Sequence, residues 1–312
     1  HITDQIDFVA GASYDWRHLI VAQDFNDPTT KVAGSFVNFP LADGHAGNAQ
    51  AALIYNYSDT GHLYANVSDR ARFPTIFERF SARFGTTLSN PSLKAERAVN
   101  YEIGGGETLF NTRVDGAVFY SDVTDALENV PINFCDTTST TAKNCTGAGG
   151  LPGTITPVSQ TQNAGDGKFY GFELSADSTI TATVQAGVRY TYVNRNLNAQ
   201  NPLNPPLPVN YHLTEVPYSQ MFAYVTWNAM PQLSITPNVQ LASDRWSNLS
   251  GNANVYLKTG SFFLVNFEAD YAFTDNIDFQ VGARNLLDSN YQLVLGFPSE
   301  GRSFFINLRI RS

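Results

Sequence analysis

The sequence predicts an all-β protein, an antiparallel up-and-down transmembrane β-barrel with about twelve strands in this chain. Three observations predict it. Apolar and polar residues alternate with a period of two in about a dozen segments, as they do in a barrel wall that faces lipid on one side. Most segments run about ten residues or more, which suits a tilted membrane strand better than the five or six residues of a soluble one. The connections between them alternate between long and short, which is typical of outer-membrane barrels.

Four segments near the C-terminus show the alternation most clearly. In residues 261–273 the odd positions from Phe263 onward are apolar, while the even positions include Asn266, Glu268 and Asp270. The four apolar sets are Phe263, Val265, Phe267, Ala269, Tyr271 and Phe273; Leu233, Ile235, Val239 and Leu241; Ile277, Phe279, Val281 and Ala283; and Phe304, Ile306, Leu308 and Ile310. None of these faces carries a charge. A Lys or Arg facing lipid near the midplane costs roughly 2–4 kcal/mol.

The connections place the strands in order along the chain. Long polar connections are expected at residues 24–48, 70–94, 129–165, 196–217, 247–260 and 288–301. Short turns are expected at 58–61, 110–111, 178–179, 230–231 and 274–276. Six long and five short connections join twelve strands. Because the short turns of such barrels are periplasmic, both termini are expected on the periplasmic side, and residues 1–312 are expected to form a single barrel domain.

The composition excludes several other classes of protein. No run of 18 apolar residues is present, so a helical membrane span is not expected. The net charge of −9 leaves no basic surface for nucleic acid. No N-terminal signal peptide is visible, so we interpret the chain as mature or as a fragment.

Two cysteines, Cys135 and Cys145, lie in one polar segment. A disulfide between them would close a short loop and stabilise it by about 2–3 kcal/mol in an oxidising compartment. A metal site would need further Cys or His nearby, and a catalytic thiol would need a base. The sequence favours the disulfide and predicts no metal site and no cofactor.

Five motifs, the first of them in two parts, resemble motifs of TonB-dependent outer-membrane receptors. They are RARFPTIFE at 70–78 together with NPSLKAE at 90–96, NYEIG at 100–104, AVFYSDVTD at 117–125, RNLLDSNY at 284–291 and GRSFF at 301–305. Their order and spacing match the family over most of the chain from about residue 50. The resemblance implies an active importer whose N-terminal plug fills the barrel and meets an inner-membrane energy-transducing complex.

The sequence departs from this family pattern in three ways. It contains neither a plug nor an energy-coupling box, its twelve strands are about half of the roughly 22 of a plugged transporter, and it ends at Ser312 where the family usually has an aromatic residue. Open strand edges cost several kcal/mol for each unpaired group in hydrocarbon. The chain therefore looks like the C-terminal part of a larger barrel, whose remaining strands lie elsewhere or in another polypeptide. The alternative is a small barrel in which the twelve strands close on themselves.

Candidate ligand contacts lie in the segment 74–90, which combines aromatic rings with cations. Its candidates are Phe77, Arg79, Phe80, Arg83 and Phe84, which suit an anionic or aromatic chelate. The alternative is a packed loop that buries its own aromatic residues. Haem is disfavoured, because receptors of the family usually carry a His here and this segment has none. Of the five histidines, only His45 and His212 lie where a ligand would touch them, and ordinary solvated side chains explain them as well.

The polar faces of the strands carry a set of lumenal charges: Arg189, Glu268, Asp270, Arg284, Arg309 and Arg311. They could hold a plug through salt bridges or pair with one another across the lumen. No Ser, His and acidic cluster can be assigned from spacing, and the Gly104-Gly105-Gly106 run is followed by neither a helix signal nor a Lys. The chain is therefore not expected to be an enzyme.

The leading hypothesis is the transport barrel of a TonB-dependent receptor in the bacterial outer membrane, importing a scarce nutrient, with a ferric siderophore as the expected cargo. Its expected partners are membrane lipid, the small-molecule ligand, and the energy-transducing complex through a plug that this chain lacks. A passive pore or surface-binding barrel without a plug is the second hypothesis. A soluble β-sandwich adhesin is the third.

Overall fold

The computed structural model describes residues 1–26, 35–81, 87–137, 144–147, 150–199, 212–248 and 255–311. Its main feature is one antiparallel sheet of twelve strands, each paired with its neighbours along the chain. In order, the wall strands are β1 (Ile6–Arg17), β4 (Gly44–Asn56), β5 (His62–Arg72), β7 (Glu96–Leu109), β8 (Thr112–Thr124), β12 (Gly165–Thr181), β13 (Val184–Ala199), β14 (Ser219–Met230), β15 (Leu233–Ala242), β18 (Phe262–Thr274), β19 (Ile277–Arg284) and β22 (Ser303–Ile310). The predicted count and up-and-down order are confirmed.

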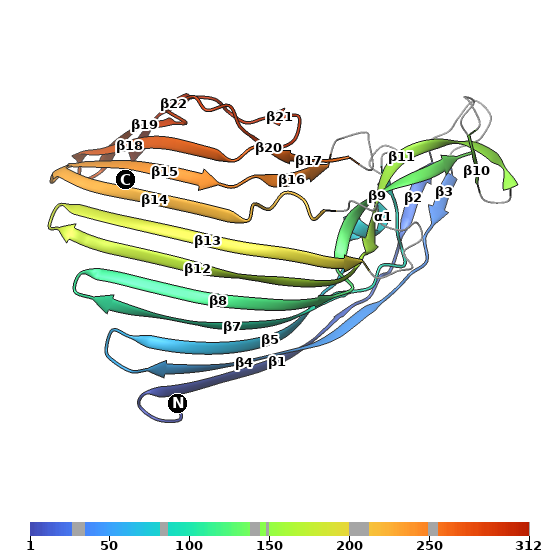
Figure 1. Cartoon of the computed structure of the whole chain (residues 1–312), viewed down its shortest axis with the longest axis horizontal. Coiled ribbons are helices and arrows are strands. Elements are labelled where there is room, and N and C mark those ends of the chain that lie inside the picture. The colour runs from blue at the N-terminus through green and yellow to red at the C-terminus, as the bar shows by residue number, and fades with distance from the viewer. Residues whose placement is uncertain are drawn as a thin grey trace.

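The short turns lie together at one end of the wall and the long connections at the other (Figure 1). Both termini lie at the end with the short turns. The turn predicted at residues 178–179 is displaced, because β12 continues to Thr181 through a register shift against β13. The strands β19 and β22 have eight residues each, fewer than expected.

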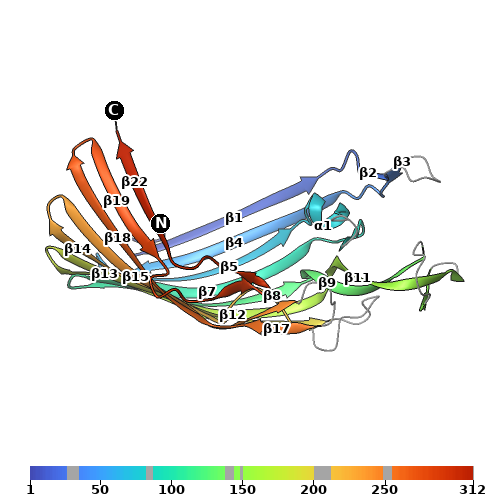
Figure 2. The same ribbon diagram turned by 90° about the horizontal axis from the view of Figure 1, so that it is seen from above.

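The wall curves into an open trough with β1 and β22 at its two rims (Figure 2). Among the described residues no backbone pairing joins β1 to β22, so the small closed barrel, one of the two predicted forms, is not formed by this chain. Each strand between the rims is hydrogen-bonded to a neighbour on both sides. Its backbone polar groups therefore have partners within the protein, as they need in a bilayer that offers no water.

The two faces of the wall differ in exposure as the alternation predicts. On β18 the even positions Leu264 and Asn266 are buried, while Phe263 on the opposite face is 43% exposed. On β22 the apolar set is even more exposed, and Phe304 reaches 73%. Side chains on the concave face crowd one another and the convex face stays open. The apolar residues on the convex face of the described wall are exposed, whereas a β-sandwich would bury them against a second sheet.

The long connections contain structure of their own. They form the hairpins β2–β3 (Gln23–Asn26, Ser35–Asn38), β16–β17 (Arg245–Asn248, Tyr256–Thr259) and β20–β21 (Gln292–Val294, Phe297–Pro298), and one short helix, α1 (Ile76–Phe80). Within the described ranges, no helix has the length and apolar character needed to cross a membrane.

The predicted cysteine loop contains an arm of strands that extends beyond the wall (Figure 1). It comprises β9 (Leu127–Asp136), β10 (Cys145–Thr146) and β11 (Pro152–Asn163), with β6 (Thr87–Leu88) added in parallel to β11. Its small core contains Val130, Ile132, Val158 and Ala164. The arm therefore has an apolar core, which a loop of Thr and Gly alone could not supply.

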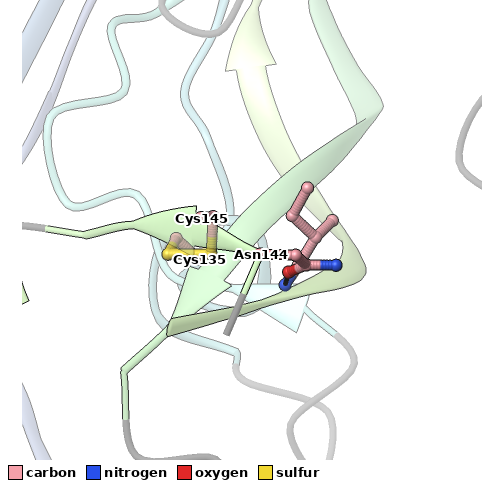
Figure 3. Close-up of a disulfide and its surroundings, with 4 residues drawn as sticks. Cys135, Asn144 and Cys145 are labelled. Atoms are coloured by element: carbon pink, nitrogen blue, oxygen red, sulfur yellow. Dashed lines mark hydrogen bonds between the residues drawn. A yellow bond between two sulfur atoms is a disulfide. The ribbon is translucent and has the colours of Figure 1, made fainter. Parts of the chain in front are cut away.

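The disulfide between Cys135 and Cys145 is present near the tip of the arm, with the Cα atoms 5.9 Å apart (Figure 3). Beside it the side chain of Asn144 accepts a hydrogen bond of 2.8 Å from the Ile155 amide. The disulfide joins β10 to β9, and the hydrogen bond joins the residue before β10 to β11. The predicted crosslink is confirmed.

Candidate functional site

Two regions bear on function: the junction where the outer segments meet the wall, and the concave face of the wall. The first contains most of the residues that carry the family motifs. At its centre is Arg72 at the end of β5, whose guanidinium binds Glu78 of α1 at 2.9 Å and Glu96 of β7 at 3.3 Å. The other oxygen of Glu96 accepts the amide of Leu127 at the start of β9. One arginine therefore connects β5, α1, β7 and the arm.

A capping box starts helix α1. The Thr75 hydroxyl accepts from the Glu78 amide at 3.1 Å, and the Glu78 carboxylate accepts from the Thr75 amide at 2.7 Å, which satisfies two otherwise free donors. Partial burial opposes ionisation of Glu78, but the hydrogen bonds from Thr75 and Arg72 outweigh it and lower the pKa of this carboxyl. The motif residues thus fix the direction in which α1 leaves the wall.

The second half of the motif, at residues 90–96, attaches the arm. The side chain of Asn90 donates to the Thr161 carbonyl at 2.9 Å. Asn163 accepts from the Lys94 amide at 2.9 Å and donates to the carbonyls of Lys94 and Asp125 at 3.2 and 2.9 Å. These bonds join two loops that are about 70 positions apart in sequence.

The structure separates the ligand candidates of α1. Phe77 is 57% exposed. Arg79 is buried and donates to the carbonyls of Ala42 and Leu93 at 3.0 and 2.8 Å, and burial, with a further contribution from Arg17, lowers its pKa. Phe80 packs on Phe39 with ring centroids 5.2 Å apart. Arg79 and Phe80 therefore match the packed-loop alternative, and of these three Phe77 alone is presented outward.

The other two candidates of that segment, Arg83 and Phe84, lie outside the described residues. The ligand-binding role of the whole set stays a prediction.

On the concave face, several predicted lumenal charges pair with other side chains of the wall. Arg189 binds Asp177 at 2.9 Å, and the Tyr224 hydroxyl donates to the same carboxylate at 2.9 Å. Arg311 pairs with Asp278. The sequence interpretation missed both acidic partners. The pairing register of β19 with β22 could have identified Asp278 as a partner, because Asp278 lies opposite Arg309 and diagonally to Arg311.

Other members of the lumenal set belong to a polar ladder. Glu268 accepts from Gln280 at 2.7 Å, and Gln280 accepts from Asn307 at 2.8 Å. Glu268 also interacts with its neighbour Asp270 and with Arg284. Arg309 has no ion-pair partner in the described part of the chain. The ladder gives the concave wall a continuous polar surface.

Several cavities open on this surface, and two of them lie at its C-terminal strands. One of about 600 Å³ lies near the short turns and is lined by Asp270, Asp278, Arg309 and Arg311 among others. The second, of about 260 Å³, lies toward the long connections and combines amides, charges and rings: Phe222, Asn238, Gln240, Glu268, Arg284, Tyr291 and Phe305. Each takes residues from both β18 and β22, and so depends on the curvature of the wall.

The two histidines singled out from the sequence have aromatic neighbours. The His212 ring lies parallel to Trp246 with centroids 3.8 Å apart and meets the edge of Tyr256. Lys258 lies over Trp246 and pairs with Asp244 at 2.7 Å. Burial, with a smaller contribution from Lys258, lowers the pKa of His212. The His45 ring lies 6.4 Å from that of Tyr14.

Charged residues bound the apolar band on the convex face. On β7, Tyr101 and Ile103 are exposed, Arg97 binds Asp69 at 2.6 Å near the outer end, and Glu107 accepts from Thr60 at 2.6 Å near the turn. Arg97 and Glu107 are ten positions apart, which is roughly 33 Å along a strand and about 25 Å across a membrane at a tilt near 40°. That height matches the apolar band of an outer-membrane barrel.

Comparison with known proteins gives consistent results. Residues 1–286 match the family model described as TonB dependent receptor-like, beta-barrel. An iron-regulated outer membrane virulence protein of Vibrio cholerae is 24% identical over 233 residues, which cover 72% of this chain and 32% of that protein.

Solved structures share the fold. The ferric-catecholate import receptor Fiu from E. coli has a TM-score of 0.71 at 18% identity, covering 99% of this chain and 43% of that one. The copper transporter OprC also has a TM-score of 0.71, at 16% identity, covering 99% and 47%. The chain thus spans less than half the length of the proteins it matches. At these identities the likeness concerns the fold alone, and the two transporters carry different metals.

Proposed function

Since the chain belongs to the TonB-dependent receptor family by its β-barrel domain, we propose that it forms wall strands of a barrel that imports a ferric siderophore across the outer membrane. Members of this family are outer-membrane transporters and not enzymes, as the sequence predicts. The cargo, the coupling to the energy-transducing complex and the periplasmic position of both termini are part of the proposal.

One observation carries the proposal: the wall has an apolar convex face of membrane height and a polar concave face. Glu268, Gln280 and Asn307 form a ladder across three strands of the concave side, while Phe304 and Phe263 stand exposed on the convex side. Lipid solvates an apolar surface such as the convex face, and a water-filled lumen solvates a polar surface such as the concave face. A receptor wall needs both at once.

The two rims require further strands in a membrane. Unpaired backbone groups of β1 and β22 would cost several kcal/mol each in hydrocarbon. We infer that additional strands, from this protein or from a second polypeptide, pair with both rims. The iron-related names of Fiu and of the Vibrio relative support iron as cargo, and the name of OprC makes copper the alternative to test.

The test is uptake by iron-starved cells in which the chromosomal gene is deleted or restored. Restored cells are expected to accumulate radiolabelled iron from a ferric siderophore, and a protonophore or loss of the energy-transducing complex is expected to abolish the uptake. Energy-independent flux would instead support the passive pore. Uptake of copper without iron would overturn the siderophore assignment.

A further inference from the structure

Three of the long connections are joined to one another at the end of the wall opposite the short turns (Figure 1). The first contributes residues 212–218, which we call the strap, and the other two contribute the hairpins β16–β17 and β20–β21. The amide of Glu215 in the strap donates to the Trp246 carbonyl of β16 at 2.8 Å. On β16 the buried hydroxyl of Ser247 accepts from the Leu295 amide between β20 and β21 at 3.0 Å. The β16–β17 hairpin is therefore held by the strap and by the last hairpin.

A pair of stacked rings attaches the strap to the β16–β17 hairpin. The His212 ring lies 3.8 Å from that of Trp246 with an angle of 4° between the planes. The Tyr256 ring of β17 meets His212 edge-on at 5.7 Å. Besides this stack, the described contact between strap and hairpin is the one backbone bond from Glu215. The position of the strap thus depends on a side chain that titrates near neutral pH.

The backbone of the strap is strained where it meets the hairpin. Glu215 has a φ of 68°, in the left-handed region that a residue with a Cβ adopts at a cost. On either side of it the strap is bonded to β13: the Thr214 carbonyl accepts from Arg195 at 2.9 Å, and the Tyr218 carbonyl accepts from the Val193 amide at 2.9 Å. Strain of this kind persists only while the surrounding contacts enforce it.

The surroundings of His212 oppose a positive charge on its ring. Lys258 lies 5.2 Å from the centroid of the same indole and is paired with Asp244. Burial, with a smaller contribution from Lys258, lowers the pKa of His212. The titratable and charged groups on the elements around the ring are Asp244 and Arg245 at the start of β16, Tyr256 and Lys258 on β17, and Glu215 and Tyr218 on the strap. Arg245 lies over Phe262, and within the described ranges no carboxylate forms an ion pair with His212.

We propose that His212 is a proton-operated latch: its neutral ring holds the strap on the β16–β17 hairpin, and its protonation releases the strap. An imidazolium would lie beside an indole that already has a cation near it, in a partly buried place without an acidic partner. Release lets the strained Glu215 relax while the bonds to β13 keep the strap at the wall. The latch concerns the long connections alone and does not depend on the cargo of the barrel.

The sign of the pH dependence follows from the direction of the shift. The ionised form is disfavoured in the folded protein, so the stack is fully present above the unfolded pKa of about 6.5 and is lost as the pH falls through the folded value. Hydrogen exchange of the purified protein in lipid vesicles measures this, with each amide compared with an unstructured peptide at the same pH. The protection of residues 213–218 is expected to fall by at least about threefold between roughly pH 7.5 and 5, while residues 186–191 of β13 keep theirs.

Three variants identify the group responsible. His212→Phe keeps a flat ring that does not titrate and is expected to protect the strap equally at both pH values. Lys258→Met removes the neighbouring cation and frees Asp244, which both favour the imidazolium, so the midpoint is expected to move up by about 0.5 pH units. His45→Phe serves as the matched control, because His45 also lies beside an aromatic ring, that of Tyr14; it is expected to behave like the wild type.

Constant protection of the strap in the wild type would overturn the latch, as would an unchanged transition in His212→Phe. If His212→Phe fails to protect the strap at any pH, Lys258→Met decides: a raised midpoint supports the latch and an unchanged one overturns it. A transition abolished by His45→Phe would assign the effect to the wrong histidine and also overturn the proposal. Uptake is not measured here, so failure of the siderophore function leaves these outcomes unaffected.

Discussion

Replacement of Asn285 tests how the final loop is held to the wall. This residue of the RNLLDSNY motif is 3% exposed and has a φ of 51°. Its side-chain nitrogen donates to the carbonyls of Ser289 and Glu300 at 2.9 and 3.3 Å, and its oxygen accepts from the Ser289 amide at 2.8 Å. Its own amide donates to Asn266 on β18 at 2.9 Å. One side chain therefore closes the connection between β19 and β22.

The magnitude of the effect follows from these contacts. Asn285→Ala deletes three hydrogen bonds and leaves their partners unsatisfied, at about 1 kcal/mol each. The left-handed backbone adds about 1 kcal/mol for Ala, which Asn tolerates better. We expect the free energy of unfolding to fall by roughly 3–4 kcal/mol. Asn285→Gly loses the same bonds but accepts the positive φ, so it is expected to be about 1 kcal/mol more stable than Asn285→Ala.

The assay is urea unfolding of the protein in lipid vesicles, followed by its heat-modifiable mobility in electrophoresis. Asn276→Ala, in an exposed short turn, serves as the matched control and is expected to stay within about 0.5 kcal/mol of the wild type. A loss below 1 kcal/mol for Asn285→Ala would refute the hydrogen-bond reasoning. A glycine variant less stable than the alanine variant would refute the argument from backbone conformation.

Three further predictions concern other parts of the molecule. Because the pKa of Glu78 is lowered in the folded state, its contribution to α1 is present above the unfolded pKa of about 4.3 and is lost as the pH falls through the folded value. The protection of the amides of residues 75–81 against hydrogen exchange, measured against an unstructured peptide at the same pH, is expected to fall at acid pH. A flat profile, or the same fall in Glu78→Gln, would contradict this. Gly171→Ala places a Cβ 1.9 Å from a carbonyl of the adjacent strand and is expected to abolish the folded wall, whereas Gly47→Ala, with no atom within 4 Å of its Cβ, is expected to fold normally; equal yields of folded protein would show the reasoning to be wrong. Because the pKa of His212 is lowered, its stack on Trp246 is expected to be stable above the unfolded pKa of about 6.5 and to weaken as the pH falls through the folded value. In a variant that keeps Trp246 as its only tryptophan, the fluorescence is expected to titrate with pH. The same titration in His212→Gln would rule out the stack as its cause.

The sequence predicted the wall well, because each strand carries its own evidence. Alternation with a period of two assigns the face of Phe263 or Phe304 without knowledge of any neighbour. The order of long and short connections then gives the hairpins. The predicted disulfide between Cys135 and Cys145 also needed only the composition of one segment.

The site was predicted less well, because exposure is a property of several segments together. Arg79 and Phe77 lie two positions apart in one aromatic and cationic segment, and nothing local separates them. The carbonyls of Ala42 and Leu93, which bury Arg79, come from loops far away in sequence. The same holds for Arg309, since no sequence pattern distinguished this arginine from Arg189 and Arg311, which form ion pairs in the wall.

The sequence alone determined the fold class, the twelve strands, the division into an apolar and a polar face, and the family motifs. These features depend on spacing along the chain, and spacing is local information. Only the tertiary structure decided that the described wall stays open between β1 and β22, that the cysteine segment contains an arm of strands, and that Arg309 has no ion-pair partner in the described part of the chain while Arg189 and Arg311 have one. Each of these depends on which distant groups meet in space, and hydrogen bonds and ion pairs form only between groups that the folded chain brings within about 3 Å.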